Sequence, residues 1–253
     1  MPIKKKSFKK KTATPNSLPF EPTMEATNPK DYIMSFFGPP GVGKTTFVNG
    51  LGRVLFLSTD RGTRFIKARR VECLDWKGMN KALDDLEKLP DASKHYDYVC
   101  IDHVADWANM AESFVLTKLN VDALTDAGYG KGWSMLKKEI YRFMERIKRL
   151  NLGIIFIAHE VIKTVKVRGI EVNKTMPLMS KQAWDAIIPL CDLVGYVGMR
   201  PDKQGGKRVE LRTLETQPRQ DLYAKDRTRR QKPAKEYELL TPDKFIGTFK
   251  PAA

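Results

Sequence analysis

Short apolar runs alternate with amphipathic segments along most of the chain. The runs that predict buried β-strands are residues 32–37, 54–58, 98–102, 153–158 and 193–197. A short strand near residues 71–73 and an alternating strand at residues 209–214 complete the predicted set. Between them, apolar residues at helical spacing predict helices near residues 79–89, 106–119, 133–150 and 181–188. Strands that alternate with helices in this way are typical of an α/β fold with a mainly parallel central sheet flanked by helices.

The ends and the longer connections of the chain show other patterns. Residues 1–30 begin with a lysine-rich run and continue through a Pro- and Thr-rich stretch, which predicts a disordered tail. One folded domain is predicted over residues 31–241, followed by a C-terminal tail at residues 242–253. Clustered glycines make residues 120–132 a predicted flexible loop, and residues 201–206 a predicted turn. Arg168 and Gly169 lie between two apolar segments and predict a hairpin turn.

The connection after the first predicted strand carries the clearest chemical motif. Its sequence, GPPGVGKT, matches the phosphate-binding loop G-x-x-x-x-G-K-[ST], and a helix is predicted to follow it. Glycines let backbone N–H groups turn inward around phosphates, and the helix N-terminus adds partial positive charge. Lys44 is expected to reach the β- and γ-phosphates. The residues predicted to bind ATP are Gly38, Pro39, Pro40, Gly41, Val42, Gly43, Lys44, Thr45 and Thr46. The alternative is a glycine-rich turn that binds nothing.

A carboxylate at the end of the strand at residues 98–102 completes the predicted nucleotide site. In phosphate-loop NTPases an Asp at such a strand end holds Mg²⁺ directly or through water, and the Ser or Thr of the loop is the other protein ligand. Asp102 and Thr45 are therefore the predicted metal ligands. ATP and Mg²⁺ are the ligands that we expect at this site.

Two further polar residues end predicted strands. Because the carboxyl ends of parallel strands share one edge, Asp60 and His159 are expected beside Lys44 and Asp102. The residue after Asp102 is His103, where many ATPases carry a Glu that orients water, so Asp60 becomes the candidate for that role. His159 is the candidate sensor of the γ-phosphate. The alternatives are an Asp60 that only caps the following turn and a His159 that is satisfied by local backbone.

The charge balance of the chain favours a polyanionic binding partner. The chain has 45 Lys and Arg residues against 30 Asp and Glu residues, a formal net charge of +15. Such an excess favours nucleic acid as a partner, although a merely soluble basic protein has the same balance. No apolar run is long enough to span a bilayer, and the basic N-terminus lacks the apolar stretch of a signal peptide, so no membrane partner is expected. Three scattered cysteines indicate neither a zinc site nor a disulfide framework, and the cytoplasm is the expected location.

Together these residues resemble the RecA/RadA family of ATPases, and most closely its small phage-encoded members that assist single-strand annealing and recombination. The resemblance covers residues 32–230 as a pattern of elements and implies a RecA-like P-loop NTPase fold. Residues 57–62, LSTDRG, resemble the segment with the family's catalytic carboxylate, where the family usually has Glu and this chain has Asp60. Residues 157–160, IAHE, resemble the motif that couples the γ-phosphate to a DNA-binding loop.

The resemblance also implies partners. Residues 224–228, AKDRT, resemble the K-x-R element whose Lys and Arg, here Lys225 and Arg227, reach the nucleotide of a neighbouring subunit in a ring or filament. The two side chains project to the same side of an extended segment, and the sequence indicates no internal partner for them. Residues 120–132 and 161–180 occupy the positions of the family's two DNA-binding loops. The predicted DNA contacts are Lys131, Lys163, Lys166, Arg168 and Lys174.

The expected function is therefore an ATPase that binds single-stranded DNA and promotes annealing or strand pairing, in the bacterial host cytoplasm if it is phage-encoded. Single-strand-binding or annealing proteins are further expected partners. Three alternatives remain open, namely a helicase-like DNA motor, a non-catalytic protein that binds ATP as a switch, and a small-molecule kinase. The basic loops favour DNA over a small acceptor, although an ordinary solvated hairpin carries similar charges.

Overall fold

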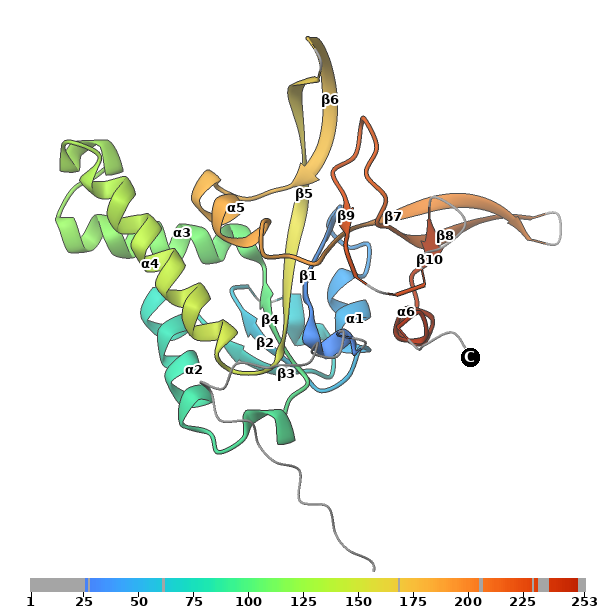
Figure 1. Cartoon of the computed structure of the whole chain (residues 1–253), viewed down its shortest axis with the longest axis horizontal. Coiled ribbons are helices and arrows are strands. Elements are labelled where there is room, and N and C mark those ends of the chain that lie inside the picture. Colours follow the sequence, from blue (N-terminus) through green and yellow to red (C-terminus); the bar gives the residue numbers. More distant parts are fainter. Residues whose placement is uncertain are drawn as a thin grey trace, which may run out of the picture.

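A mixed β-sheet forms the centre of the molecule, with the strand order β10-β8-β7-β1-β5-β4-β2-β3 (Figure 1). This computed structural model describes residues 26, 28–60, 62–167, 169–204, 207–228, 230–231 and 237–249. The strands on this path are β1 (Ile33–Gly38), β2 (Val54–Ser58), β3 (Arg69–Glu72), β4 (Tyr98–Asp102), β5 (Gly153–Val167), β7 (Leu193–Gln204), β8 (Lys207–Glu215) and β10 (Glu238–Leu239). Two further strands pair beside it, β6 (Ile170–Pro177) with β5 and β9 (Lys225–Asp226) with β7.

The strands from β7 to β3 run parallel to one another, whereas β8 and β10 are antiparallel to their neighbours. In the register, His159 of β5 lies beside Gly38 of β1, and Asp102 of β4 lies beside Ile157 of β5. The carboxyl ends of β1, β4 and β5 therefore meet at one edge of the sheet, where α/β proteins bind ligands. This arrangement confirms the predicted α/β fold with a mainly parallel central sheet.

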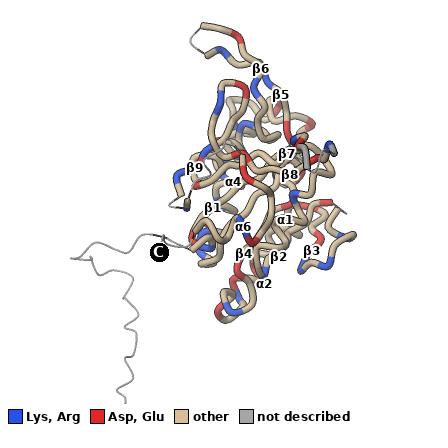
Figure 2. The backbone as a smooth tube through the Cα atoms, turned by 90° about the vertical axis from the view of Figure 1, so that its right-hand side faces the viewer, with Lys and Arg blue, Asp and Glu red and all other residues tan. Residues whose placement is uncertain are grey.

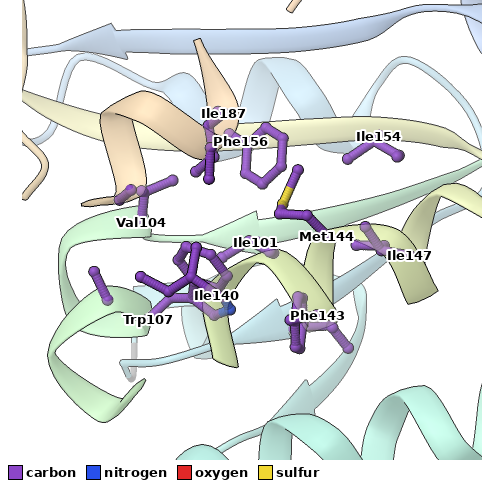
Figure 3. Packing of buried hydrophobic residues seen from close by; sticks show 14 of the residues in the cluster. Ile101, Val104, Trp107, Ile140, Phe143, Met144, Ile147, Ile154, Phe156 and Ile187 are labelled. Atoms are coloured by element: carbon purple, nitrogen blue, oxygen red, sulfur yellow. The ribbon is translucent and has the colours of Figure 1, made fainter. Parts of the chain in front are cut away.

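Helices cover both faces of the sheet (Figure 1). One face packs on α2 (Trp76–Lys88), α3 (Val104–Leu119), α4 (Lys131–Lys148) and α5 (Lys181–Ile187), and the other packs on α1 (Lys44–Asn49) and α6 (Pro242–Gly247). Figure 3 shows the first core, in which Trp107 and Phe143 of the helices pack near Ile101 and Phe156 of the strands. Alternate strand residues enter opposite cores, which is why these strands appear as continuous apolar runs in the sequence.

Local capping and short turns fix where the helices begin. The Asp75 carboxylate accepts a hydrogen bond from the Gly78 N–H at 2.7 Å, so α2 begins at Trp76, before the predicted start at residue 79. Short 3₁₀ turns join other elements, namely η1 (Pro29–Asp31), η2 (Gly62–Phe65), η3 (Ala92–Lys94) and η4 (Leu124–Ala127).

In the described part of the chain, no helix is both long and apolar enough to cross a membrane.

The C-terminal segment differs from its prediction. Residues 242–253 are predicted to be a tail, but α6 forms there, and Phe245 and Phe249 are buried. Their rings lie 5.8 Å from Phe36 and 5.5 Å from Tyr32, respectively, measured between ring centroids. Two isolated aromatic residues give no periodic signal, so this contact was not evident in the sequence. At the other end, residues 1–25 and 27 of the predicted N-terminal tail lie outside the described residues.

Two predicted connections are also more ordered than expected. Pro201 belongs to β7 and pairs with Glu210 of β8, so the turn predicted at residues 201–206 is wrong over its first four residues. The loop predicted at residues 120–132 contains η4 and the start of α4, where Gly132 packs on the backbone of Leu124. The hairpin predicted around Arg168 is present, because Val167 of β5 pairs with Ile170 of β6, while Arg168 itself lies outside the described residues.

Candidate nucleotide-binding site

The residues predicted to bind and hydrolyse ATP gather at the carboxyl edge of the parallel strands. A cavity of about 340 Å³ is lined there by Lys44, Asp60, Asp102 and His159, together with other residues of the glycine-rich loop. Lys44 begins α1, directly after the loop that follows β1, and Asp60 lies just after β2. Asp102 ends β4, and His159 belongs to β5, which lies between β1 and β4 in the sheet. The arrangement of the strands in the sheet therefore brings four polar side chains, from distant parts of the sequence, to one cavity.

The glycine-rich loop needs its glycines for two different reasons. A Cβ atom on Gly38 would lie 2.0 Å from the carbonyl oxygen of Val197, so only glycine lets the loop leave β1 so close to β7. Gly43 has a φ of +95°, in the left-handed region that other residues rarely adopt. These two positions are the first and last glycines of the motif, and the structure therefore explains their place in the pattern.

Lys44 is buried and folds back over the loop. Its Nζ donates hydrogen bonds to the carbonyl oxygens of Gly38 at 2.9 Å and Pro39 at 2.8 Å. Burial lowers the pKa of Lys44, while the nearby carboxylates of Asp102 and Glu160 act in the opposite direction. A phosphate group in the loop would offer this cation a charged acceptor, which forms stronger hydrogen bonds than neutral carbonyl groups do.

Thr45 and Asp102 lie together, as the metal site requires. The Thr45 hydroxyl group donates a hydrogen bond to Oδ2 of Asp102 at 2.8 Å. Burial raises the pKa of Asp102, and the hydrogen bond from Thr45 opposes this shift. Among the described residues no group of three or more His, Cys, Asp or Glu side chains could hold a metal ion by itself. One carboxylate and one hydroxyl group fit Mg²⁺, which keeps several waters and takes other ligands from substrate phosphates.

Asp60 lines the cavity and also caps a turn. Its Oδ1 accepts a hydrogen bond from the Gly62 N–H at 2.8 Å, so the capping role considered as an alternative is present. The carboxylate is exposed, and it lies close enough to act on the pKa of Asp102 and His159. Both interpretations of Asp60 are therefore compatible with its position, and a substitution has to separate them.

The exchange of Asp60 for Asn separates the two roles, because Asn keeps an oxygen that can accept from Gly62. We expect Asp60→Asn to bind ATP nearly as the wild type does and to hydrolyse it at least about tenfold more slowly, since a general base or water-positioning carboxylate contributes on that order or more. ATP affinity and single-turnover hydrolysis are the measurements. Unchanged hydrolysis in Asp60→Asn, with slow hydrolysis only in Asp60→Ala, would assign Asp60 to the turn alone.

His159 and His103 form a pair beside the cavity. Their ring centroids are 4.7 Å apart, and Nε2 of His103 lies 3.2 Å from Oδ2 of Asp106. Burial lowers the pKa of His159, and the positive charge of Lys44 lowers it further. Within the described residues, Nδ1 of His159 is buried without a hydrogen-bond partner, so it is not satisfied by local backbone. A ring N–H of this imidazole can donate a hydrogen bond to a phosphate oxygen.

Glu160 is a site residue that the sequence analysis did not assign. Burial, together with the nearby Glu160 carboxylate, raises the pKa of Tyr196 to about 12. Oε2 of Glu160 is buried and has no hydrogen-bond partner among the described residues. The only sequence signal for Glu160 is that it follows His159 at a strand end, and the side chains of adjacent strand residues point to opposite faces.

Lys225 and Arg227 lie at the opposite edge of the sheet. Lys225 is the first residue of β9 and Arg227 directly follows it, and β9 pairs with the first residues of β7. Arg227 Nε donates to Oδ1 of Asp192 at 2.8 Å, and Lys225 Nζ donates to the Ile188 carbonyl oxygen at 3.1 Å. The sequence indicates no internal partner for these cations, but the structure supplies partners because β9 lies beside a segment about 35 residues earlier in the chain. Neither side chain reaches the nucleotide site of its own chain.

The predicted DNA contacts fall on two separate parts of the molecule. On the β5–β6 hairpin, Lys163 lies directly opposite Lys174, whereas Lys166 lies opposite Glu171. Since side chains alternate along a strand, Lys163 and Lys174 share one face and Lys166 lies on the other. Lys131 begins α4, beyond the far end of α3, whose 16 residues span about 24 Å.

Comparison with models of protein families gives a match over most of the chain. The sequence model described as "AAA domain" matches residues 30–228, which include every described residue of the site. A search of curated proteins found no match to the chain.

Proposed function

The chain belongs to the AAA domain family of P-loop ATPases, and from this premise we propose that it is a Mg²⁺-dependent ATPase that binds single-stranded DNA. Family membership indicates nucleotide binding and hydrolysis. The DNA partner, the RecA-like character, and a role in annealing or strand pairing are proposals that rest on the resemblance and on the arrangement of charges.

Hydrolysis is assigned to the side chains around the cavity. Lys44 holds the β- and γ-phosphates and neutralises charge that builds up as the bond to the leaving group breaks. Thr45 and Asp102 would hold Mg²⁺, which when bound would stabilise the negative charge of the phosphates. Asp60 orients the attacking water from the side of β2, and His159 contacts the γ-phosphate from β5.

The observation that carries the DNA proposal is the pair of Lys163 and Lys174. The hairpin that bears them projects from the body of the protein (Figures 1 and 2). Like charges directly opposite one another on antiparallel strands are destabilising, and the one internal contact of the pair among the described residues is that of the Lys174 ammonium group with the Tyr223 ring, 5.9 Å from the ring centroid. A phosphate between the two ammonium groups would remove this repulsion. A nucleic-acid backbone supplies such phosphates without requiring any particular sequence.

The hairpin is connected to the nucleotide site through one strand. β5 runs without interruption from the edge of the site at His159 into the hairpin, and Leu178 after β6 donates a backbone hydrogen bond to the His159 carbonyl oxygen at 2.8 Å. A shift of His159 toward a bound γ-phosphate would therefore move both ends of the hairpin. This connection supports ATP-dependent binding of DNA, in which ATP orders the hairpin and hydrolysis releases it.

Salt dependence tests the DNA proposal. If Lys163 and Lys174 each neutralise one phosphate, the variant in which both are Ala should bind single-stranded DNA with a salt slope up to about two units flatter than that of the wild type. Lys166→Ala is the matched control, because Lys166 belongs to the same hairpin but lies on the other face, 4.0 Å from Glu171. We expect its slope to change little. Affinity for a labelled oligonucleotide over a range of salt concentrations is the measurement.

Two results would contradict this assignment. An unchanged slope in the double variant would remove the hairpin from the DNA interface, and a loss of binding after deletion of residues 1–11 would transfer the interface to the basic tail. Comparable losses in Lys166→Ala and in the double variant would indicate a diffuse electrostatic attraction. ATP binding without any turnover would favour the non-catalytic switch, and directional strand displacement would favour the helicase-like motor.

A further inference from the structure

Arg212 lies against the phosphate-binding loop, in a place that the sequence motif does not include. Three atoms of its side chain, Nε, Cζ and Nη1, are each 3.5 Å from the position that a Cβ atom would take on Gly43. The side chain is exposed, and no hydrogen bond or ion pair of its guanidinium group occurs among the described residues. A cation thus lies beside the last glycine of the loop, at the distance of ordinary contact with a Cβ atom placed there.

The backbone of Arg212 is held from both sides. It belongs to β8, where it pairs with Met199 of β7, and its carbonyl oxygen accepts a hydrogen bond from the Leu240 N–H at 3.0 Å. Leu214, two residues further along the strand, is buried in the core that includes α1, so Arg212 faces the same side of the sheet as that helix. The placement of the guanidinium group beside the loop is therefore a consequence of the fold.

Arg212 approaches the loop from the flank opposite the metal site. In the sheet order β8-β7-β1-β5-β4, β1 with its loop lies between the strand of Arg212 and the strand of Asp102. In phosphate-binding loops the backbone cradles the α- and β-phosphates, while the Lys reaches the β- and γ-phosphates and the hydroxyl residue holds the metal. The γ-phosphate therefore belongs on the Asp102 flank, and the α-phosphate belongs on the flank of Arg212.

We propose that Arg212 is a nucleotide-binding residue, whose side chain contacts the α- and β-phosphates of ATP or ADP bound to its own chain. This inference rests on the proposed function, since it assigns one more contact to the same site. The planar guanidinium group can donate two parallel hydrogen bonds to phosphate oxygens, which a lysine at the same place cannot do. The contact would also attach the β7–β8 hairpin to the nucleotide.

Equilibrium binding of ADP and ATP to the full chain tests the inference. We expect Arg212→Ala to weaken both nucleotides by about tenfold or more, because hydrogen bonds to charged groups contribute on that scale. Arg212→Lys should recover only part of the loss. The matched control is Arg208→Ala, which removes an exposed arginine from the same face of the same strand, four residues further from the loop. We expect the control to bind both nucleotides within about twofold of the wild type.

Each other result overturns the inference. Unchanged affinity in Arg212→Ala would exclude a direct contact, and a loss for ATP with none for ADP would place Arg212 at the γ-phosphate instead. An equal loss of nucleotide affinity in Arg208→Ala would show that the effect comes from the overall positive charge of the hairpin and not from a direct contact of Arg212. A wild-type chain that binds neither nucleotide would contradict the proposed function itself, whereas wild-type binding that is insensitive to Arg212→Ala contradicts only the contact proposed here.

Discussion

Replacing Lys44 or Asp102 with Ala is expected to lower the rate of ATP hydrolysis at least about a hundredfold, which is typical when a positioned electrostatic group is removed from a reacting centre. Lys44 is the buried cation of the loop, and the hydroxyl group of Thr45 lies 2.8 Å from the Asp102 carboxylate. Loss of Lys44 removes charge stabilisation of the phosphates. Loss of Asp102 removes the only carboxylate that contacts Thr45 among the described residues.

Steady-state turnover at saturating ATP, followed by titration with Mg²⁺, measures both effects. Asp102→Ala should need more Mg²⁺ to reach its reduced rate, whereas Lys44→Ala should show no such shift. Lys81→Ala is the control, because Lys81 lies on the exposed face of α2, remote from the cavity. Near-normal turnover in both Lys44→Ala and Asp102→Ala would exclude this cavity as the hydrolytic site.

The parts of the fold that were predicted correctly are those with local signals. The bounds of β2 and β4 coincide with the apolar runs at residues 54–58 and 98–102, because strands buried on both faces need apolar residues at every position. The carboxyl edge followed from the parallel arrangement, since any polar residue that ends such a strand must lie there. Asp60 and Asp102 were placed there correctly for this reason, and His159 also lies there, although β5 continues past it to Val167.

The missed features depend on contacts between distant parts of the chain. Arg212 reaches Gly43 only because β8 returns beside β7, and no spacing in the sequence records that approach. Glu160 is distinguished from other carboxylates of the sheet by its proximity to Tyr196, which belongs to a different strand. The same holds for Arg227, whose partner Asp192 precedes β7. Sequence patterns indicate on which face of the sheet a side chain lies, but the pairing of the strands determines which residues that side chain contacts.

The second large effect is expected from Arg227, through a neighbouring subunit. Its position at the amino edge of the sheet keeps it from the nucleotide of its own chain, but subunits stacked head to tail would bring that edge to the carboxyl edge of the next chain. An arginine supplied by a neighbour accelerates phosphoryl transfer by about a thousandfold or more. We therefore expect Arg227→Ala to be folded, to bind ATP, and to hydrolyse it about a thousandfold more slowly.

The ion pair with Asp192 offers a competing explanation that can be tested. The Arg227 side chain is 54 % exposed, and pairs of this kind contribute up to about 1 kcal/mol to the free energy of unfolding. If this pair is the whole role of Arg227, Asp192→Asn and Arg227→Ala should have the same small effect on the midpoint of thermal unfolding and leave turnover nearly unchanged. If Arg227 acts on a neighbour, Asp192→Asn should keep most of the turnover that Arg227→Ala loses.

Mixing two inactive variants distinguishes an action between subunits from any effect within one chain. Lys44→Ala protomers have a defective loop but an intact Arg227, whereas Arg227→Ala protomers have an intact loop. Where a Lys44→Ala protomer presents its Arg227 to the loop of an Arg227→Ala protomer, one complete nucleotide site forms. Turnover in the mixture should therefore exceed the sum of the separate activities, with a maximum near equal proportions. Mixed assemblies, verified by two different affinity tags, that show only the summed activity would exclude the role between subunits, because no internal contact of Arg227 depends on which variant its neighbour is.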